Sequence, residues 1–277
     1  MFENVLGHEK EKQLLKNNIL NDNMSHAYLF TGKKGIGKFT LAQEFAKEIL
    51  KTDNLDSCPD YKCIKKRQDK KDIVIEQIRK EVIDDVYVIP ATGEYKVYII
   101  DDAETLNIAS QNSLLKTLEE PPEYVVLILI SSNESTFLPT ILSRVNKIAF
   151  GGVNSDIISK YISKKYNIVL DENVINYIDG SIGFASNVVE NNLIAKFKNV
   201  EDLYNLIIKK NIVEALKYSQ NIQFSEENLL DYLEYMLYFN NRYRSIRYVE
   251  RAIKRLKNNG NYDIVIDSMI LKIIESI

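Results

Sequence analysis

The chain is poor in cysteine and histidine, with two of each in 277 residues, and it has no tryptophan. Two cysteines do not make the disulfide framework that holds small secreted domains together. The longest apolar runs, such as Val125–Ile130, fall far short of the roughly 20 residues that a membrane-spanning helix needs. The first residues also lack the basic start and apolar stretch of a secretory signal. We therefore expect a cytoplasmic protein with no membrane partner.

An excess of charge of one sign is absent as well. The sequence has 36 Lys and Arg residues against 39 Asp and Glu residues, a formal net charge of -3. The net charge therefore gives no overall electrostatic attraction to nucleic acid. Any contact with DNA must come from a local basic patch or be shared with partners. The length is sufficient for two or three domains that each bury a core.

Apolar strands alternate with amphipathic helices in the first half of the chain. The expected strands are 26–31, 97–100, 125–130 and 148–150, and the expected helices are 9–20, 38–51, 73–83 and 105–119. This alternation predicts a parallel sheet with helices on both of its faces. The polar segment 52–71 is assigned no element.

The pattern changes after Gly151-Gly152 and stays helical to the end. Further helices are expected at 157–166, 171–178 and 185–197, and the helical pattern continues from about residue 201 onward. The expected domains are an α/β domain at 1–151, a small helical domain at 152–199 and a terminal helical bundle at 200–277.

A glycine-rich segment between the first strand and the second helix fits the core of a phosphate-binding loop. Gly32, Gly35 and Gly37 let backbone N–H groups point at phosphate oxygens, and the following helix N-terminus adds a favourable dipole. Lys38 would reach the outer phosphates of a nucleotide. The alternative is a strand-to-helix turn that needs glycine and has lost its ligand.

The position after the lysine departs from this motif. A Ser or Thr normally follows and gives Mg²⁺ its hydroxyl ligand, but here the residue is Phe39, and Thr40 comes one place later. One residue turns a helical side chain by roughly 100°. Thr40 is therefore misdirected unless the helix start is remodelled, and binding of ATP with Mg²⁺ is expected to be weak.

Two adjacent carboxylates follow the strand at 97–100. Asp101 lies at the carboxyl end of that strand beside the phosphate loop, where a carboxylate can hold Mg²⁺ through water. Asp102 stands where working ATPases usually have a Glu that polarises the attacking water, and its side chain is one methylene shorter. Glu104, in the turn, is a second candidate for that base. The alternative is a solvated acidic helix N-terminus, which the helix dipole favours.

Taken together, several segments resemble the clamp-loader group of AAA+ proteins. They are His26–Phe30, the phosphate loop, Lys96–Asp101, Asn112–Pro122 and Leu138–Arg144. The resemblance covers nearly the whole chain, and it implies an α/β AAA+ P-loop domain, a small helical lid and an all-α C-terminal collar that joins subunits. Within the group the sequence is most similar to the delta-prime type of DNA polymerase III subunit, without the long extension of the tau form.

The resemblance also assigns a role to Arg144. Ser143-Arg144-Val145 is similar to the Ser-Arg-Cys motif of the group, whose arginine projects into the ATP site of the adjacent subunit. A guanidinium supplied in trans stabilises the charge that spreads over the γ-phosphoryl oxygens. The alternative is an exposed arginine in an ordinary salt bridge, which contributes about 0–1 kcal/mol.

In the lid, Gly183 stands where the motor subunits of the group have an arginine that touches the γ-phosphate. The resemblance therefore implies a stator with little or no ATPase and no polymerase activity, within a holoenzyme that is a nucleotidyltransferase. Its partners would be gamma/tau and delta subunits, with the sliding clamp and primed DNA reached through the complex. The alternatives are an ATP-hydrolysing gamma-type subunit and, from another class, a P-loop kinase acting on a small molecule.

Many members of this group hold a structural zinc with four cysteines after the phosphate-loop helix, whereas this segment has only Cys58 and Cys63. Structural zinc needs four ligands, usually Cys or His. We expect no stable zinc site. The alternative is a weak site that Asp60 or Asp69 completes.

The segment 242–257 is an expected helix with seven cations and one acid. The cations are Arg242, Arg244, Arg247, Arg251, Lys254, Arg255 and Lys257, and the acid is Glu250. Apolar residues recur at helical spacing and predict packing into the terminal bundle. We assign the helix to assembly of the complex. A solvated basic face is the default for such cations, and contact with DNA phosphates or acidic partner surfaces is the alternative.

Overall fold

A computed structural model describes residues 1–67, 70–224 and 228–277. The chain divides into two compact units, one of Met1–Tyr161 with Asp179–Phe184 and one of Ile162–Ile178 with Ala185–Ile277. The division into three domains at residues 151 and 199 stays a prediction. Within the described part of the chain, no helix is long and apolar enough to cross a membrane.

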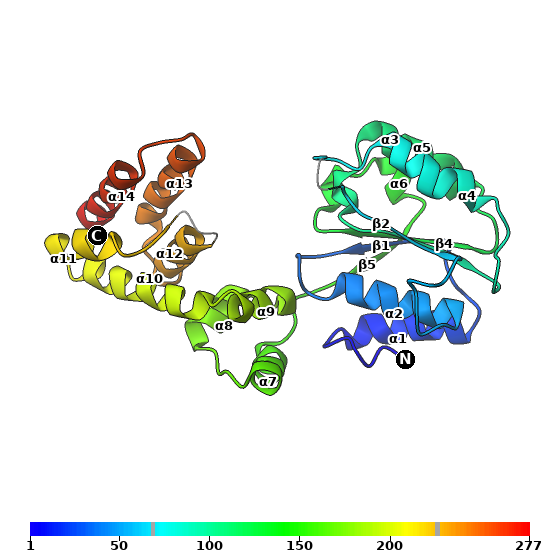
Figure 1. The fold of residues 1–277 in the computed structure, drawn as a ribbon, viewed down its shortest axis with the longest axis horizontal. Coiled ribbons are helices and arrows are strands. Elements are labelled where there is room, and N and C mark those ends of the chain that lie inside the picture. Colours follow the sequence, from blue (N-terminus) through cyan, green and yellow to red (C-terminus); the bar gives the residue numbers. More distant parts are fainter. Residues whose placement is uncertain (68–69, 225–227) are drawn as a thin grey trace. The chain divides into compact units, whose positions relative to one another are not determined.

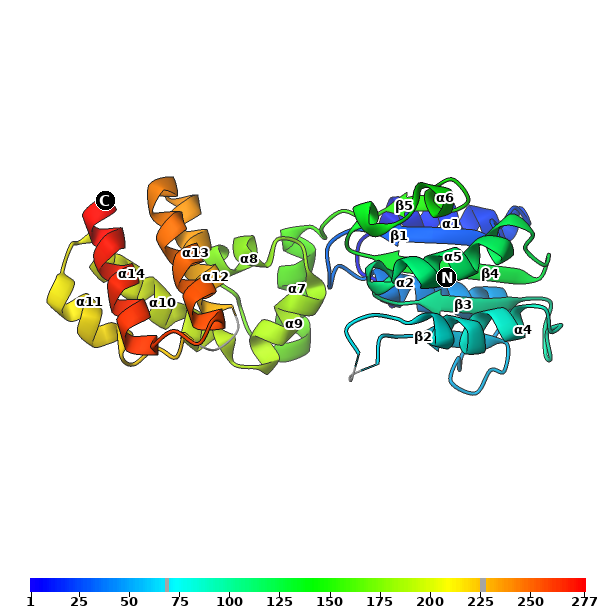
Figure 2. The same cartoon turned by 90° about the horizontal axis from the view of Figure 1, so that it is seen from above.

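The first unit is built on a five-stranded parallel sheet in the order β2-β3-β4-β1-β5, visible in Figure 2. The strands are β1 (Ala27–Thr31), β2 (Tyr61–Ile64), β3 (Lys96–Ile100), β4 (Val125–Ser131) and β5 (Asn146–Ala149). Thr31 of β1 pairs with Ser131 on one side and Ala149 on the other. Because all strands run the same way, their carboxyl ends meet at one edge, where open α/β sheets bind ligands.

Helices cover both faces of this sheet (Figure 1). One face carries α1 (Glu9–Leu20) and α2 (Lys38–Leu50). The other carries α3 (Ile75–Ile78), the π-helical turn η1 (Arg79–Ile83), α4 (Asp84–Val86), α5 (Ile108–Glu119) and α6 (Pro139–Leu142). Two 3-10 turns, η2 (Ala103–Thr105) and η3 (Glu134–Thr136), follow β3 and β4.

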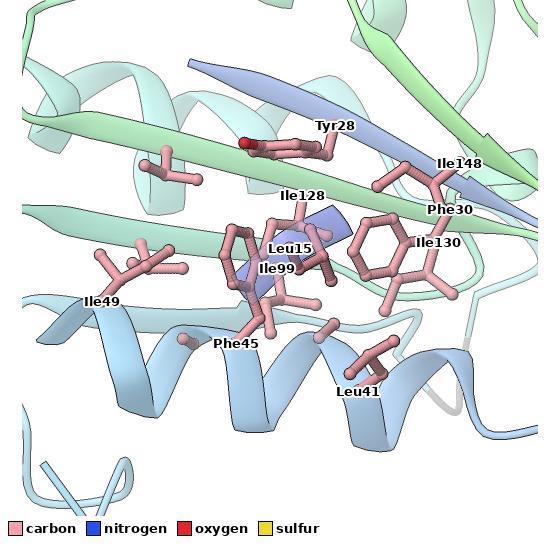
Figure 3. Packing of buried hydrophobic residues seen from close by; sticks show 14 of the residues in the cluster. Leu15, Tyr28, Phe30, Leu41, Phe45, Ile49, Ile99, Ile128, Ile130 and Ile148 are labelled. Carbon is pink, nitrogen blue, oxygen red and sulfur yellow. The ribbon is translucent and has the colours of Figure 1, made fainter. Parts of the chain in front are cut away.

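The core is split by the sheet into two layers, because successive strand residues point to opposite faces. Tyr28 and Phe30 of β1 pack with Phe45 of α2 on one side, as Figure 3 shows. Ala27 and Leu29, the alternate residues of the same strand, belong to the cluster on the other side. Every residue of β3 and β4 is buried, as expected for a sheet covered on both faces.

The second unit is helical. It contains α8 (Glu172–Ile178), α10 (Leu193–Ile208), α11 (Ile212–Ser219), α12 (Leu229–Phe239), α13 (Tyr243–Lys257) and α14 (Tyr262–Ser276), while α7 (Ser155–Tyr166) and α9 (Ile182–Glu190) cross its boundaries. Tyr177, Phe197 and Tyr232 join α8, α10 and α12 through ring contacts of 4.4–5.5 Å. The Tyr232 hydroxyl donates to Glu201 at 2.6 Å, which satisfies two buried polar groups.

The expected architecture is confirmed: an α/β domain with a parallel sheet that helices cover on both faces, followed by helices. Two local expectations are wrong. The segment 52–71 contains β2, an edge strand whose polar composition hid it, because only Ile64 of its four residues is buried. The helix expected at 185–197 is interrupted at Asn192, whose φ of +54° ends α9 and starts α10.

Candidate functional site

The phosphate loop connects β1 to α2 at the carboxyl edge of the sheet, where the sequence places it. Gly32, Gly35 and Gly37 all have positive φ angles, of 142°, 75° and 109°. A Cβ atom on Gly32 would lie 2.5 Å from the carbonyl oxygen of Phe150. The loop therefore requires glycine both for its dihedral angles and for the close approach of the neighbouring strand.

Lys38, the lysine of the motif, is turned onto its own loop. Its side chain is buried, and Nζ donates to the carbonyl oxygens of Gly32 and Lys33, both at 2.5 Å. Burial lowers the pKa of this ammonium, and the charge of Glu104 acts in the opposite direction. A phosphate would have to replace two carbonyl partners before the ammonium could reach it.

The two residues after Lys38 lie as the one-residue shift predicts. Phe39 is half-buried against the core between the sheet and α2, and the Nζ of Lys65 stands 4.1 Å from the centre of its ring. Thr40 is exposed on the helix surface. The side chain of Thr40 is thus exposed to solvent, and Phe39 stands at the sequence position of the usual hydroxyl ligand.

Asp101 directly follows β3 beside this loop and is half-buried. Burial raises the pKa of its carboxyl, the charge of Asp102 raises it further, and a hydrogen bond from the Asp102 backbone N–H opposes both effects. The Nζ of Lys65 stands 4.0 Å away. Asp101 therefore lies where sequence reasoning expects a metal-binding carboxylate, with a lysine of this chain beside it.

Lys34 of the phosphate loop faces the other two acids of this edge. Its Nζ lies 2.8 Å from Asp102 and 3.9 Å from Glu104, and hydrogen bonding to Asp102 raises the pKa of the ammonium. Glu104 in turn accepts a 2.5 Å hydrogen bond from the Ser132 hydroxyl, after β4. Both candidates for the general base are therefore bonded to groups of this chain.

The segment Asp179–Phe184 lies directly on the phosphate loop within the same compact unit. The Gly183 N–H donates to the Gly35 carbonyl at 2.8 Å, and the Ser181 hydroxyl donates to the Lys34 carbonyl at 3.1 Å. A Cβ atom on Gly183 would lie 3.1 Å from the Cα of Gly35. An arginine at position 183 would crowd the loop in this arrangement, so glycine suits the close contact.

Sequence reasoning missed His8, Lys34 and Ser181 as parts of this site. The Nε2–H of His8 donates to the Ile36 carbonyl at 2.6 Å, and its ring meets Phe150 edge-on. Lys34 occupies a position that the loop motif leaves open, and Ser181 lies outside the motif. The sequence carries no local signal for such contacts, because the partners lie 28 and 147 residues apart.

Arg144 follows α6 and precedes β5, and its side chain is about one third exposed. Its guanidinium lies 2.9 Å from the Glu119 carboxylate at the end of α5, and donates to the carbonyl oxygen of Thr140 at 2.9 Å and the hydroxyl of Ser143 at 3.1 Å. Only one of these three partners is charged, and Glu119 is half-exposed.

The strand register places Arg144 away from the phosphate loop of its own chain. Ala149 pairs with Thr31, the last residue before the loop, whereas Asn146 pairs with Tyr28. β5 therefore carries the chain about 10 Å along the sheet between the two edges. Arg144 precedes Asn146 and lies at the amino edge, opposite the phosphate loop.

The segment that contains Cys58 and Cys63 is anchored by hydrogen bonds to the carboxylate of Asp60. Asp60 is buried and accepts hydrogen bonds from the N–H groups of Ala91 (2.7 Å) and Thr92 (2.8 Å) and from the Thr92 hydroxyl. Cys58 and Cys63 are both free thiols, and burial raises the pKa of Cys63. The described residues contain no group of three Cys, His, Asp or Glu side chains that could hold a metal. Asp69 lies outside the described residues, and the absence of zinc stays a prediction.

Comparison with known proteins identifies the family. A family model described as DNA polymerase III, delta subunit, matches residues 7–154, a little over half of the chain. The gamma subunit of DNA polymerase III from Buchnera aphidicola subsp. Acyrthosiphon pisum is 30% identical over 233 residues, covering 76% of this chain and 64% of that protein. The tau subunit from Bacillus subtilis is 34% identical over 198 residues, covering 65% of this chain and 34% of that protein.

A solved structure also resembles the whole chain. The gamma subunit-related protein of DNA polymerase III from Thermotoga maritima superposes with a TM-score of 0.60 at 17% identity, covering 96% of this chain and 98% of that one. This likeness shows the fold. The chain spans less than two thirds of the gamma and tau relatives above, and their names leave the delta-prime type a prediction. The family match over residues 7–154 places this chain in the DNA polymerase III delta-subunit family, within the clamp-loader group of AAA+ proteins.

Proposed function

We propose that this chain is a delta-prime-type subunit of a clamp loader, in which Arg144 completes the ATP site of an adjacent gamma/tau subunit. The chain acts as a comparatively rigid stator with little or no ATPase and no polymerase activity. With gamma/tau and delta subunits it opens a sliding clamp and places it on primed DNA during replication in the cytoplasm.

The observation that carries this proposal is the position of Arg144. The residue lies at the sheet edge opposite its own phosphate loop, so its guanidinium is not available to a phosphate bound there. It is nevertheless partly exposed beside the start of β5. A nucleotide that this arginine contacts must therefore belong to another chain.

The contacts of Arg144 would allow its guanidinium to leave a carboxylate for a phosphate group. A guanidinium offers five N–H donors in a planar fork that matches carboxylate and phosphate oxygens alike. Its bridge to the half-exposed Glu119 contributes about 0–1 kcal/mol, because water screens both charges. The γ-phosphoryl group of a neighbouring ATP carries more charge, so Arg144 can leave Glu119 for it and stabilise the charge that develops during hydrolysis.

The phosphate loop of this chain supports the stator role. Such a loop implies Mg²⁺-ATP, which needs a hydroxyl ligand for the metal and an ammonium for the phosphates. Here the side chain of Thr40 is exposed to solvent, and the Lys38 ammonium donates to carbonyl oxygens of its own loop. The Lys34 ammonium already neutralises Asp102. The residues present do not fit an Mg²⁺-ATP site that is competent for hydrolysis, and we assign no catalytic step to it.

The alternative function is an ATP-hydrolysing gamma-type subunit. The matched curated proteins bear gamma and tau names, and Lys38 and Asp101 of the motif are retained here. A titration of the isolated chain with a fluorescent ATP analogue separates the two. Tight Mg²⁺-dependent binding with turnover would establish the gamma type. A small-molecule P-loop kinase is less well supported, because the matched family takes part in DNA replication.

The proposal is tested by Arg144→Ala in a clamp loader reconstituted from this chain and its gamma/tau and delta partners. We expect the DNA-stimulated ATPase rate to fall at least tenfold, since an arginine supplied in trans is worth about 10³ or more in the rate at its site. Arg144→Lys restores little, because an ammonium lacks the planar fork. Size-exclusion chromatography checks that the complex still assembles.

Lys147→Ala is the matched control for this experiment. Lys147 lies three residues further on in β5, is exposed and forms an ion pair with Glu134. Its substitution removes the same charge three residues away from Arg144, and the ATPase rate should stay within about twofold. A normal rate with Arg144→Ala in an intact complex would reject the trans role.

A further inference from the structure

Helix α13 carries a row of five cations along its exposed face. The row consists of Arg244, Arg247, Arg251, Lys254 and Arg255, and each of these side chains is exposed. At roughly 100° per residue the five fall within a sector of about 100°, and they extend over about 16 Å of helix. The buried residues Ser245, Val249 and Ala252 face the bundle instead.

No carboxylate neutralises this cationic row among the described residues. The structure records no ion pair for any of its members in residues 1–67, 70–224 and 228–277, and Arg247 contacts only the hydroxyl and ring of Tyr248. Glu250, the one acid of α13, approaches Glu234 of α12. Burial raises the pKa of Glu234 first, and the charge of Glu250 adds to it. At roughly 100° per residue Glu250 lies about 40° beyond Lys254, at the border of the row, and the structure records no ion pair between Glu250 and the row among the described residues.

A groove follows the row between α13 and α14. Its volume is about 340 Å³, and its lining includes Arg251, Lys254, Arg255 and Lys272 together with Tyr248. The other lining residues are neutral, and no Asp or Glu is among them. α13 packs between α12 and α14, with which it makes its main contacts (Figure 2). The groove thus collects four positive charges in one concave surface.

Exposed aromatic rings stand at the other end of the cationic row. Tyr238, Phe239 and Tyr243 are 54–60% exposed, and the rings of Tyr238 and Tyr243 meet edge-on with centroids 5.4 Å apart. Tyr243 is one helical turn before Arg247, and roughly 40° from it around the helix. Large aromatic side chains are rarely left this exposed together without a binding partner.

We propose that this face of the second unit binds single-stranded nucleic acid without sequence preference. The cationic row neutralises backbone phosphates, and Tyr238, Phe239 and Tyr243 stack on unpaired bases. An acidic polypeptide would use the cations and leave the rings unexplained, and a duplex offers no free base faces. The proposal does not rest on the role of Arg144, which lies in the other unit.

The first test measures binding of the full chain to a fluorescent 15-nucleotide oligothymidylate by anisotropy, between 50 and 300 mM salt. Because single strands give a slope of about −0.7 per neutralised phosphate, the five cations predict a log–log salt slope of about −3.5. Arg251→Ala with Arg255→Ala should weaken binding about tenfold or more and reduce the slope by about 1.4.

The matched control is Lys209→Ala with Lys217→Ala. These lysines belong to the same helical unit and line a different groove, which also contains Asp202 and Glu214. The double substitution removes two charges without touching the cationic row. It should leave affinity within about twofold and the salt slope unchanged.

The second test addresses the aromatic end of the surface. Tyr243→Ala should weaken oligothymidylate binding about fivefold or more without changing the salt slope, because base stacking is lost and the charges remain. Tyr243→Phe should restore the affinity, since the ring stacks without its hydroxyl. A 15-base-pair duplex and polyglutamate serve as competitors, and both should compete at least tenfold less well than the single strand.

Three results would overturn the proposal. One is no salt-dependent binding of the oligonucleotide at 50 mM salt, and another is equal competition by the duplex, which would point to backbone contact alone. The third is equal competition by polyglutamate with no effect of Tyr243→Ala, which would assign the face to an acidic protein segment. Circular dichroism and thermal melts of each variant establish that the changes act on a folded chain.

Discussion

At the carboxyl edge of the sheet, Lys38, Lys34 and Ser181 form hydrogen bonds within the protein itself, whereas at the amino edge the Arg144 guanidinium has one half-exposed charged partner. The first set of contacts joins the loop to its own carbonyls and to the segment Asp179–Phe184, so a ligand would have to displace Lys38 from two carbonyl oxygens and the Ser181 hydroxyl from the loop. The second can be replaced by water or phosphate through a change of side-chain rotamer. The difference indicates which edge can meet another molecule.

The amino half of the sheet also contains a more buried set of ion pairs, centred on Asp85, which contrasts with the exposed bridge of Arg144 to Glu119. Asp85 of α4 accepts hydrogen bonds from Tyr98 (2.6 Å) and Lys96 (3.0 Å), and Lys62 lies 3.0 Å away. Lys96 is buried, unlike Arg144. Burial would raise the pKa of Asp85, but the hydrogen bonds from Tyr98, Lys96 and Lys62 lower it to about 2.

The largest effect is therefore expected from Asp85→Asn, which should reduce the free energy of unfolding at pH 7 by about 3 kcal/mol because it leaves the buried Lys96 ammonium without its partner. The folded pKa of Asp85 lies below its ordinary 3.8. Its contribution is fully present above about pH 4 and is lost as the pH falls through about 2. Urea unfolding at pH 7, 4 and 2.5 should show the wild-type and variant curves converging toward acid. Parallel curves would contradict this account.

Gly35→Ala tests the closed edge. Gly35 has a φ of +75°, and its added Cβ would lie 2.4 Å from the Ser181 hydroxyl. We expect a loss of about 2 kcal/mol in unfolding free energy, from the left-handed backbone and the displaced serine. Gly93→Ala is the control, because nothing lies within 4 Å of that Cβ. Equal stability of the two variants would show that the segment Asp179–Phe184 does not press on the loop.

Lys38→Ala and Arg144→Ala, measured side by side in the reconstituted complex, compare the two edges directly. The Arg144 substitution should lower the DNA-stimulated ATPase at least tenfold, which corresponds to about 1.4 kcal/mol of activation free energy. The Lys38 substitution should change it less than about twofold, since the lysine is committed to carbonyl oxygens of its own loop. The reverse order of effects would favour the gamma-type alternative.

Glu119→Gln should have the smallest effect. The bridge to Arg144 is exposed, so unfolding free energy should change by no more than about 0.5 kcal/mol. The ATPase rate of the complex should stay the same or rise slightly, because the glutamine competes less well for the guanidinium. A fall in the ATPase rate comparable to that of Arg144→Ala would mean that Glu119 holds the arginine in its active position, and is not merely the partner that the arginine leaves.

Much of the fold followed from local patterns. Helix α1 begins and ends at the expected residues, and three of the four expected strands are within about one residue of those observed. These elements have strong periodicity or continuous apolar runs, which act over neighbouring residues. β2 was missed because it is an edge strand with one buried residue, and such a strand differs little from a polar loop.

The candidate site was predictable only in part. The glycine loop, the misplaced Thr40 and the exposed arginine are visible in the sequence, because each depends on spacing or on a short motif. The pairing of Lys34 with Asp102 and the contact of Ser181 with the loop are not, because they join residues 68 and 147 positions apart. No periodicity encodes such pairs.

The sequence by itself determined that a strand, a glycine loop and a helix stand together, and that the usual magnesium hydroxyl is lacking, because dihedral angles and helical phase are properties of consecutive residues. Tertiary structure decided which groups close that loop, and it decided that Arg144 lies at the opposite edge. The position of Arg144 relative to the phosphate loop depends on the parallel pairing of β1 with β5. These strands are more than a hundred residues apart in the sequence, so only the folded chain brings them side by side. The tertiary structure therefore places Arg144, which the sequence had singled out, away from the phosphate loop of its own chain.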